Sequence, residues 1–244
     1  MIASLLAMMV AVPFAQSSVP APVVVREDEV TRLSVEVAAL LNSEAVTRVQ
    51  LRKLQEQTFP EQFANDPNFA VLERQYAGIT SEAIDAMMPV LTASALDELP
   101  ALQRELAGVY AEYFTATELA EMLDFYRGPT GTKLISAVSS GADFSQLVGS
   151  AMRAGDKAVV TEQDLTAGVN AGVATMIRSL TDDEAAEVVA FGMSTVGRKL
   201  ATVNGRVQQF TVSIANRPRP ELEKQVEAAV MGVVQRRMGQ GEGQ

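Results

Sequence analysis

The stretch FTATELAEMLDFYRGPTGTKL, residues 114–134, constrains the fold of this chain more than any other part of its sequence. Thr115 followed by Glu118 is the pattern of a capping box, in which a hydroxyl and a carboxylate each satisfy a backbone N–H at a helix N-terminus. A glycine at position 128 predicts a left-handed backbone conformation that ends this helix, and Pro129 is suited to the first turn of a second helix. The stretch therefore predicts a helix, a sharp corner and a second helix.

One face of the first predicted helix is apolar. Its spacing of three and four residues predicts that this face packs inward. Phe114 before the cap and Leu119 after it form the pattern of a hydrophobic staple. The residues of the inward face are Leu119, Met122, Leu123 and Tyr126.

The same pattern recurs later in the chain. A gap-free alignment of residues 114–135 with residues 180–201 keeps the capping box and the Gly-x-Lys-Leu sequence after the corner. Ser194 and Thr195 replace the Gly-Pro pair, so we expect a looser second corner. Two related helical units explain the alignment; chance similarity is the alternative, because capping boxes are common. The main pairs are Thr115 with Thr181, Glu118 with Glu184, Phe125 with Phe191, Gly131 with Gly197, and Lys133 with Lys199.

The composition supports helices throughout. Aromatic residues make up 5% of the chain and Trp is absent, so the core must consist of Ala, Val, Leu and Met, which suit packing of helix on helix. We expect an all-α fold, an antiparallel helical bundle built from two related helix-corner-helix units. The first unit covers residues 27–160, the second begins near Thr161 and covers 161–238, and residues 239–244 form a flexible tail.

Other helices follow from apolar periodicity and from proline. A helix is expected soon after Arg26, and another from about Ser43 until the prolines of FPEQFANDPNF interrupt it. Pro89 and Pro100 mark kinks or helix starts in a long helical segment. A final amphipathic helix is expected from Glu221.

The first residues resemble a secretory signal peptide. An apolar run of about fourteen residues is too short to cross a membrane and precedes small and polar residues. No Lys or Arg precedes Arg26, so either the N-terminal amine supplies the charge or translation starts upstream of Met1. Cleavage after Ala15 or Ser17 is possible in this pattern, and Ser17 fits better. We expect a signal peptide over 1–17, a linker over 18–26 and a periplasmic or secreted protein; the alternative is a cytoplasmic protein with a frayed N-terminus.

Charge and the absence of cysteine limit the partners. A net charge of −10 argues against nucleic acid and anionic membrane surfaces, which attract clustered Lys and Arg. Without Cys the chain has no disulfide and no Cys-linked lipid, so we expect no stable membrane anchor after cleavage of the signal. The sequence is also compatible with a homo-oligomer.

Few residues offer catalytic chemistry. His and Cys are both absent, which removes the commonest general base and the thiol nucleophile. The carboxylates of Glu118, Glu121 and Asp124 recur every three residues, and we interpret them as a solvated face that complements a helix N-terminus. Asp66, between Asn65 and Asn68, is interpreted as a turn residue rather than a calcium ligand, and the methionines as core rather than copper ligands. We assign no catalytic, cofactor-binding or metal-binding residue.

A set of residues around the first corner resembles the motif of the bacterial domain-of-unknown-function family 2059. The similarity is clearest over residues 106–149, and Gly128 stands where that family more often has Ser or Thr. The resemblance implies an exported, helical protein and supplies no catalytic residue. The residues are Tyr113, Phe114, Thr115, Glu118, Leu119, Phe125, Tyr126, Pro129, Gly131 and Lys133.

Two functions are compatible with the sequence. The first is a non-enzymatic exported module that binds a protein partner, a small apolar ligand or itself in an apolar groove between helices. The second is a cell-envelope hydrolase that uses paired carboxylates and a divalent ion. Candidate recognition residues lie at the two predicted corners. The favoured interpretation, however, is that Tyr126 belongs to the core and that the basic residues pair with neighbouring acidic residues. The corner residues are Tyr113, Tyr126, Arg127, Lys133, Arg198 and Lys199.

Overall fold

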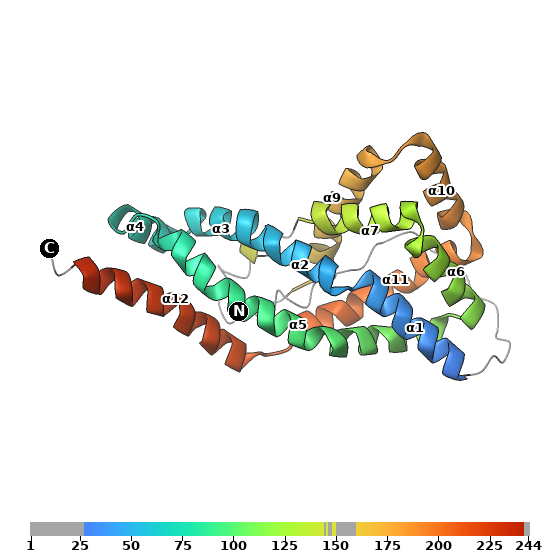
Figure 1. Cartoon of the computed structure of the whole chain (residues 1–244), viewed down its shortest axis with the longest axis horizontal. Coiled ribbons are helices and arrows are strands. Elements are labelled where there is room, and N and C mark those ends of the chain that lie inside the picture. Colours follow the sequence, from blue (N-terminus) through green and yellow to red (C-terminus); the bar gives the residue numbers. More distant parts are fainter. Residues whose placement is uncertain (1–26, 144, 146–147, 150–159, 242–244) are drawn as a thin grey trace.

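The structure is a computed structural model that describes residues 27–143, 145, 148–149 and 160–241 (Figure 1). The predicted signal peptide and linker lie outside these residues. Within them the chain forms helices and no strand, which confirms the all-α prediction. None of the described helices is both long enough and apolar enough to span a bilayer.

The first part of the chain runs along the molecule in short helices and returns in one long helix (Figure 1). Ser43 caps α2 by accepting a hydrogen bond from the N–H of Val46, as expected for a helix that starts there. Asp66 caps α4 through the N–H groups of Asn68 and Phe69, so its carboxylate serves a turn. The elements are α1 (Glu27–Leu41), α2 (Glu44–Lys53), the π-helical turn η2 (Leu54–Thr58), α3 (Phe59–Asn65), α4 (Pro67–Gln75) and α5 (Ile79–Tyr113).

The rest of the chain forms two helical corners and a C-terminal helix. Thr161, the predicted start of the second unit, caps α9 with a complete capping box. In Figure 1, α12 runs back along the first half of α5 in the opposite direction. The elements are α6 (Ala116–Arg127), α7 (Pro129–Gly141), α9 (Glu162–Ser179), α10 (Asp182–Met193), α11 (Thr195–Ala215) and α12 (Pro220–Gly241).

The prolines and the C-terminal helix test the predicted helix boundaries. Pro89 and Pro100 both lie inside α5, so of the two predicted alternatives, kinks or helix starts, neither proline is a helix start. Pro60 lies where the π-helical turn η2 passes into α3 without a break, because Thr58 and Phe59 keep helical backbone angles, and the helix is interrupted at Asp66, before Pro67. The last helix extends to Gly241, beyond the start that we predicted for the flexible tail.

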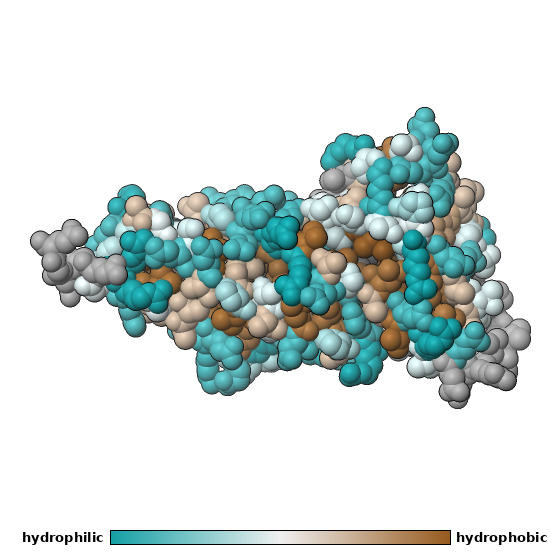
Figure 2. All heavy atoms as spheres, viewed as in Figure 1, coloured by the Kyte–Doolittle hydropathy of each residue, from teal (hydrophilic) through white to brown (hydrophobic). Residues whose placement is uncertain are grey.

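Two hydrophobic clusters form the core. One joins α2, η2 and α3 to the first half of α5 and to α12; the other joins α1 to the end of α5 and to α6, α7 and α11. Both clusters contain residues from before and after residue 160, so the two predicted units do not have separate cores. Figure 2 shows apolar side chains along the middle of one face, with polar side chains on both sides.

Candidate functional site

The first corner begins with the predicted cap. The Thr115 hydroxyl oxygen accepts a hydrogen bond from the Glu118 N–H at 3.3 Å, and the Glu118 carboxylate accepts one from the Thr115 N–H at 2.8 Å. Phe114 and Leu119 are both buried on either side of this cap. The capping box is therefore confirmed, and the two apolar residues lie where a staple requires them.

Gly128 does not have the left-handed conformation that the sequence predicted. Its φ of −65° and ψ of 164° are extended, and its carbonyl starts the next helix, α7. Pro129 favours this conformation, because a proline ring disfavours helical angles at the residue before it. Gly78, before α5, is the described glycine with a positive φ, at 86°.

The second corner reproduces the first. Thr181 and Glu184 form another complete capping box, and Ser194 has φ −66° and ψ 166°, almost the angles of Gly128. The Ser194 hydroxyl caps α11 by accepting a hydrogen bond from the Gly197 N–H at 3.0 Å. The second corner therefore has the same backbone geometry as the first, and the Ser194 hydroxyl supplies the N-cap that Gly128 lacks.

Both corners bring two helix backbones into direct contact at a glycine. A Cβ atom on Gly131 would lie 2.1 Å from the carbonyl oxygen of Phe125, and one on Gly197 would lie 2.1 Å from that of Phe191. No side chain fits at such distances without moving a helix. The aligned glycines therefore set the angle of both corners.

The two corners also contact each other, through residues that the alignment pairs. Lys199 binds Glu118 at 2.7 Å, and Lys133 binds Glu184 at 2.6 Å. The rings of Phe125 and Phe191 stack with centroids 3.9 Å apart and planes 1° apart. Contacts that are reciprocal in this way are characteristic of a two-fold interface, here formed within one chain.

The carboxylates of the motif are held in their charged form. Burial raises the pKa of Glu118, but the Lys199 ammonium and the Thr115 cap lower it by more, so the net shift is downward. Lys133 and the Thr181 cap lower the pKa of Glu184. Both acids are thus engaged in caps and ion pairs rather than available as proton donors.

The other predicted corner residues also have partners in the protein. Tyr126 is buried in the core, and burial raises its pKa. Arg127 binds Glu36 of α1 at 2.7 Å, and Arg198 donates a hydrogen bond to the Met193 carbonyl. Tyr113 is partly buried against the same cluster. The positions of Tyr126 and Arg127 agree with the favoured interpretation of a core tyrosine and bases that complement acids, whereas Arg198 bonds to a backbone carbonyl instead.

The acidic residues of the motif that the structure describes lie apart from one another and have different surroundings. Glu121 and Asp124 are exposed on α6, as a solvated face requires, whereas Glu118 is half-buried against Lys199, so the prediction was wrong for that residue. Glu187 accepts a hydrogen bond from the Thr130 hydroxyl. Over the described residues, no three acidic side chains lie close enough together to hold a metal ion.

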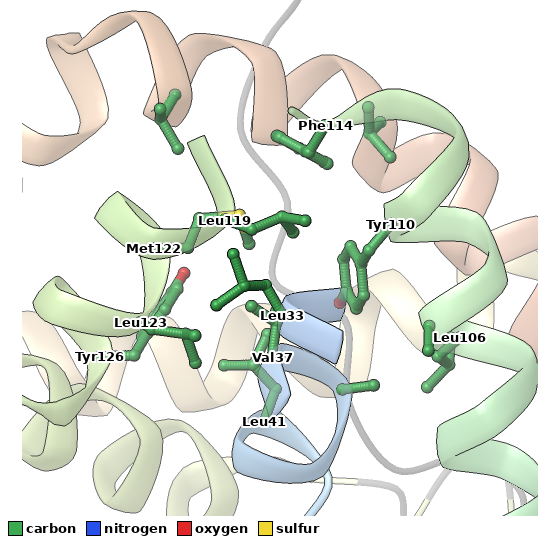
Figure 3. Packing of buried hydrophobic residues seen from close by; sticks show 14 of the residues in the cluster. Leu33, Val37, Leu41, Leu106, Tyr110, Phe114, Leu119, Met122, Leu123 and Tyr126 are labelled. Carbon is green, nitrogen blue, oxygen red and sulfur yellow. The ribbon is translucent and has the colours of Figure 1, made fainter. Parts of the chain in front are cut away.

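The two corners differ in what covers them. Figure 3 shows Leu33 and Val37 of α1 packed beside Leu123 of α6, which is 2% exposed. At the equivalent positions of α10, Val189 is 58% exposed and Met193 is 68% exposed. No local sequence signal reveals this difference, because it depends on which corner α1 packs against.

A cavity of about 270 Å³ lies between α5, the α1–α2 junction and the segment that joins α11 to α12. Two ion pairs border it, Glu98 with Arg219 at 2.7 Å and Glu105 with Arg217 at 2.8 Å. A more open groove of about 830 Å³ continues along α5 and shares the first of these pairs. The apolar residues of the cavity are Ala95, Leu99, Ala101, Leu102, Ile214 and Pro218.

Comparison with known proteins gives one match. Residues 100–143, which include α6 and α7, match the profile of a family described as "Uncharacterized protein conserved in bacteria (DUF2059)". Neither the curated proteins nor the solved structures contain a match to this chain. The segment around the first corner is therefore similar to DUF2059, which confirms the resemblance found in the sequence and leaves the activity to be inferred from the structure.

Proposed function

We propose that this protein is an exported, non-enzymatic binding module that holds a small apolar ligand in the cavity beside α5. The observation that carries the proposal is the cavity itself, which lies between helices and whose lining combines apolar side chains with polar and charged ones. Clefts between helices in which polar groups stand beside apolar side chains are common sites for small ligands. The two corners act as the framework that fixes the end of α5.

The charges around the cavity define the class of ligand. Each guanidinium at the border is paired with a carboxylate, Arg217 with Glu105 and Arg219 with Glu98. A charged ligand would have to break one of these pairs to find a counter-ion, whereas an uncharged ligand leaves both intact. We therefore expect a neutral molecule whose apolar body lies against Leu99 and Ile214.

Among the residues that the structure describes, the contacts of the motif carboxylates do not favour the hydrolase. A carboxylate mechanism needs two acids that face a common point, as in glycoside hydrolysis. Glu118 is bound to Lys199, and Glu121 and Asp124 point to solvent from one helix. The proposal of a binding module rests on the cavity, and the acids are explained by caps and ion pairs.

A neutral fluorescent probe, N-phenyl-1-naphthylamine, tests the cavity. The protein contains no Trp, so probe emission is recorded without interference from tryptophan. Ala101 and Ala93 are both exposed on α5, and Ala101 lines the cavity while Ala93 lines only the open groove. We expect saturable binding, a dissociation constant raised at least about tenfold by Ala101→Phe, and little change with Ala93→Phe. Binding that is absent, or that is insensitive to Ala101→Phe, would overturn the proposal.

Export has its own test. Intact-mass spectrometry of the protein from the envelope fraction of its native host measures the mature N-terminus. We expect a chain that begins near Ser18, because Ala15 and Ser17 match the small residues of a cleavage site. A chain in the cytoplasmic fraction that still carries residues 1–17 would contradict export and leave the cavity unaffected.

A further inference from the structure

The outer face of α10 carries an apolar stripe. Its residues are spaced at three, four and seven positions, which places them in one row along the helix. All four are exposed, and the packing partners of α10, α11 and α7, lie on its other side. The residues of the stripe are Ala186, Val189, Ala190 and Met193.

The first corner shows what this kind of face does in the fold. Val189 aligns with Leu123, which α1 covers. Met193 aligns with Arg127, which binds Glu36 of α1. This face of α6 therefore receives an amphipathic helix. The corresponding face of α10 is uncovered, with Val189 58% and Met193 68% exposed.

The charges at the two ends of the stripe favour a second copy of the same chain. Asp182 and Asp183 are exposed at the N-terminal end of α10. Arg198 is exposed at the other end, where it donates to the Met193 carbonyl. We propose that α10 packs against α10 of a second copy in the antiparallel direction, so that each acidic end meets the Arg198 of its partner. Helix α1 of a second copy fits less well, since its apolar face already packs against α5 and α6 of its own chain.

The interface is small, so the dimer should be weak. Stable complexes bury about 800 Å² on each partner, and a stripe with two large side chains on a twelve-residue helix gives less. We expect a dissociation constant of about 100 µM, within reach of sedimentation equilibrium. The interface lies on α10 and the ligand cavity beside α5, so the two proposals are independent.

Sedimentation equilibrium of the full chain between about 1 µM and 1 mM tests the dimer. Val189→Asp should raise the dissociation constant at least about tenfold, because it buries an unpaired charge. The matched control is Met238→Asp, which places the same charge at an exposed apolar residue of α12, and it should leave the constant unchanged. Circular dichroism checks that every variant keeps its helices.

Charge reversal tests the direction of packing. Asp182→Arg alone and Arg198→Asp alone should each weaken the dimer several-fold, and the double variant should recover most of the loss, because the exchanged charges meet again across the interface. A monomer at 1 mM, a dimer insensitive to Val189→Asp, or a double variant weaker than both single ones would each overturn the proposal. Probe binding to the Val189→Asp monomer should be normal.

Discussion

The two corners of this molecule have the same local geometry and different surroundings. Thr115 and Thr181 make the same cap, and Gly128 and Ser194 have nearly the same backbone angles. The first corner is covered by α1, whereas α10 of the second has no buried residue. Caps and close glycine contacts thus determine the shape of a corner, and a distant segment of the chain determines whether it is core or surface.

The largest difference is expected at the aligned pair Leu123 and Val189. Leu123→Ala removes side-chain atoms packed against α1 and should lower the free energy of unfolding by about 2–5 kcal/mol. Val189→Ala removes exposed atoms, so its effect should stay within about 0.5 kcal/mol. Urea unfolding followed by circular dichroism, below the concentration at which any dimer forms, measures both. Equal losses in the two variants would show that α10 is covered in the same way as α6.

Substitutions of the corner glycines should have the second largest effect on the free energy of unfolding. A Cβ atom at Gly131 or Gly197 collides with backbone, so each Ala substitution forces a helix to shift, at a cost of about 1–3 kcal/mol. We expect the larger cost at Gly131, because α6 is held between α1 and α7, while α10 can move outward.

The control for both substitutions is Gly192→Ala. Gly192 lies inside α10, and its Cβ would have nothing within 4 Å, so Ala should raise stability by up to about 1 kcal/mol through helix propensity. Thermal unfolding ranks the three variants. A Gly131→Ala protein as stable as the parent would mean that the close contact at the corner is absent in solution.

The reciprocal ion pairs allow a finer comparison. The Lys199 and Glu118 side chains are 16% and 18% exposed, whereas Lys133 and Glu184 are 36% and 25% exposed. A double-mutant cycle with Lys199→Met and Glu118→Gln should give a coupling of about 1–2 kcal/mol, because both groups are mostly shielded from water. The same cycle on Lys133 and Glu184 should give a smaller coupling that falls faster as salt is added. The reverse order would contradict the burial that distinguishes the two pairs.

Local features of both corners could be predicted from the sequence. The caps at Thr115 and Thr181 depend on residues three positions apart, and the staple joins Phe114 to Leu119, five positions later. The prediction for Gly128 failed even so, because two signals competed: glycine after a helix favours the left-handed conformation, and proline at the next position favours an extended one.

The contacts between the corners could not be predicted in the same way. Lys199 and Glu118 are far apart in the chain, and no local pattern shows that they meet. The alignment paired Phe125 with Phe191 as equivalents without showing that they stack on each other. The cavity is equally invisible in sequence, since Leu99, Ile214 and Arg217 come together only when α5 packs against the end of α11.

The pH dependence of stability should show the smallest difference between the two corners. In the folded protein the Lys199 ammonium and the Thr115 cap outweigh burial and hold the pKa of Glu118 below its unfolded value of 4.5. Such a group stabilises the fold above the unfolded pKa, and this contribution is lost as the pH falls through the folded pKa. The stability difference between the parent and Glu118→Gln should therefore be constant from pH 7 to about pH 5 and should shrink below the unfolded pKa. The stability difference between the parent and Glu184→Gln should change with pH in the same direction but by a smaller amount, because Lys133 is more exposed than Lys199. A difference that persists unchanged at pH 2 would mean that Glu118 acts through its cap geometry alone, and that the ion pair between the corners contributes nothing to their association.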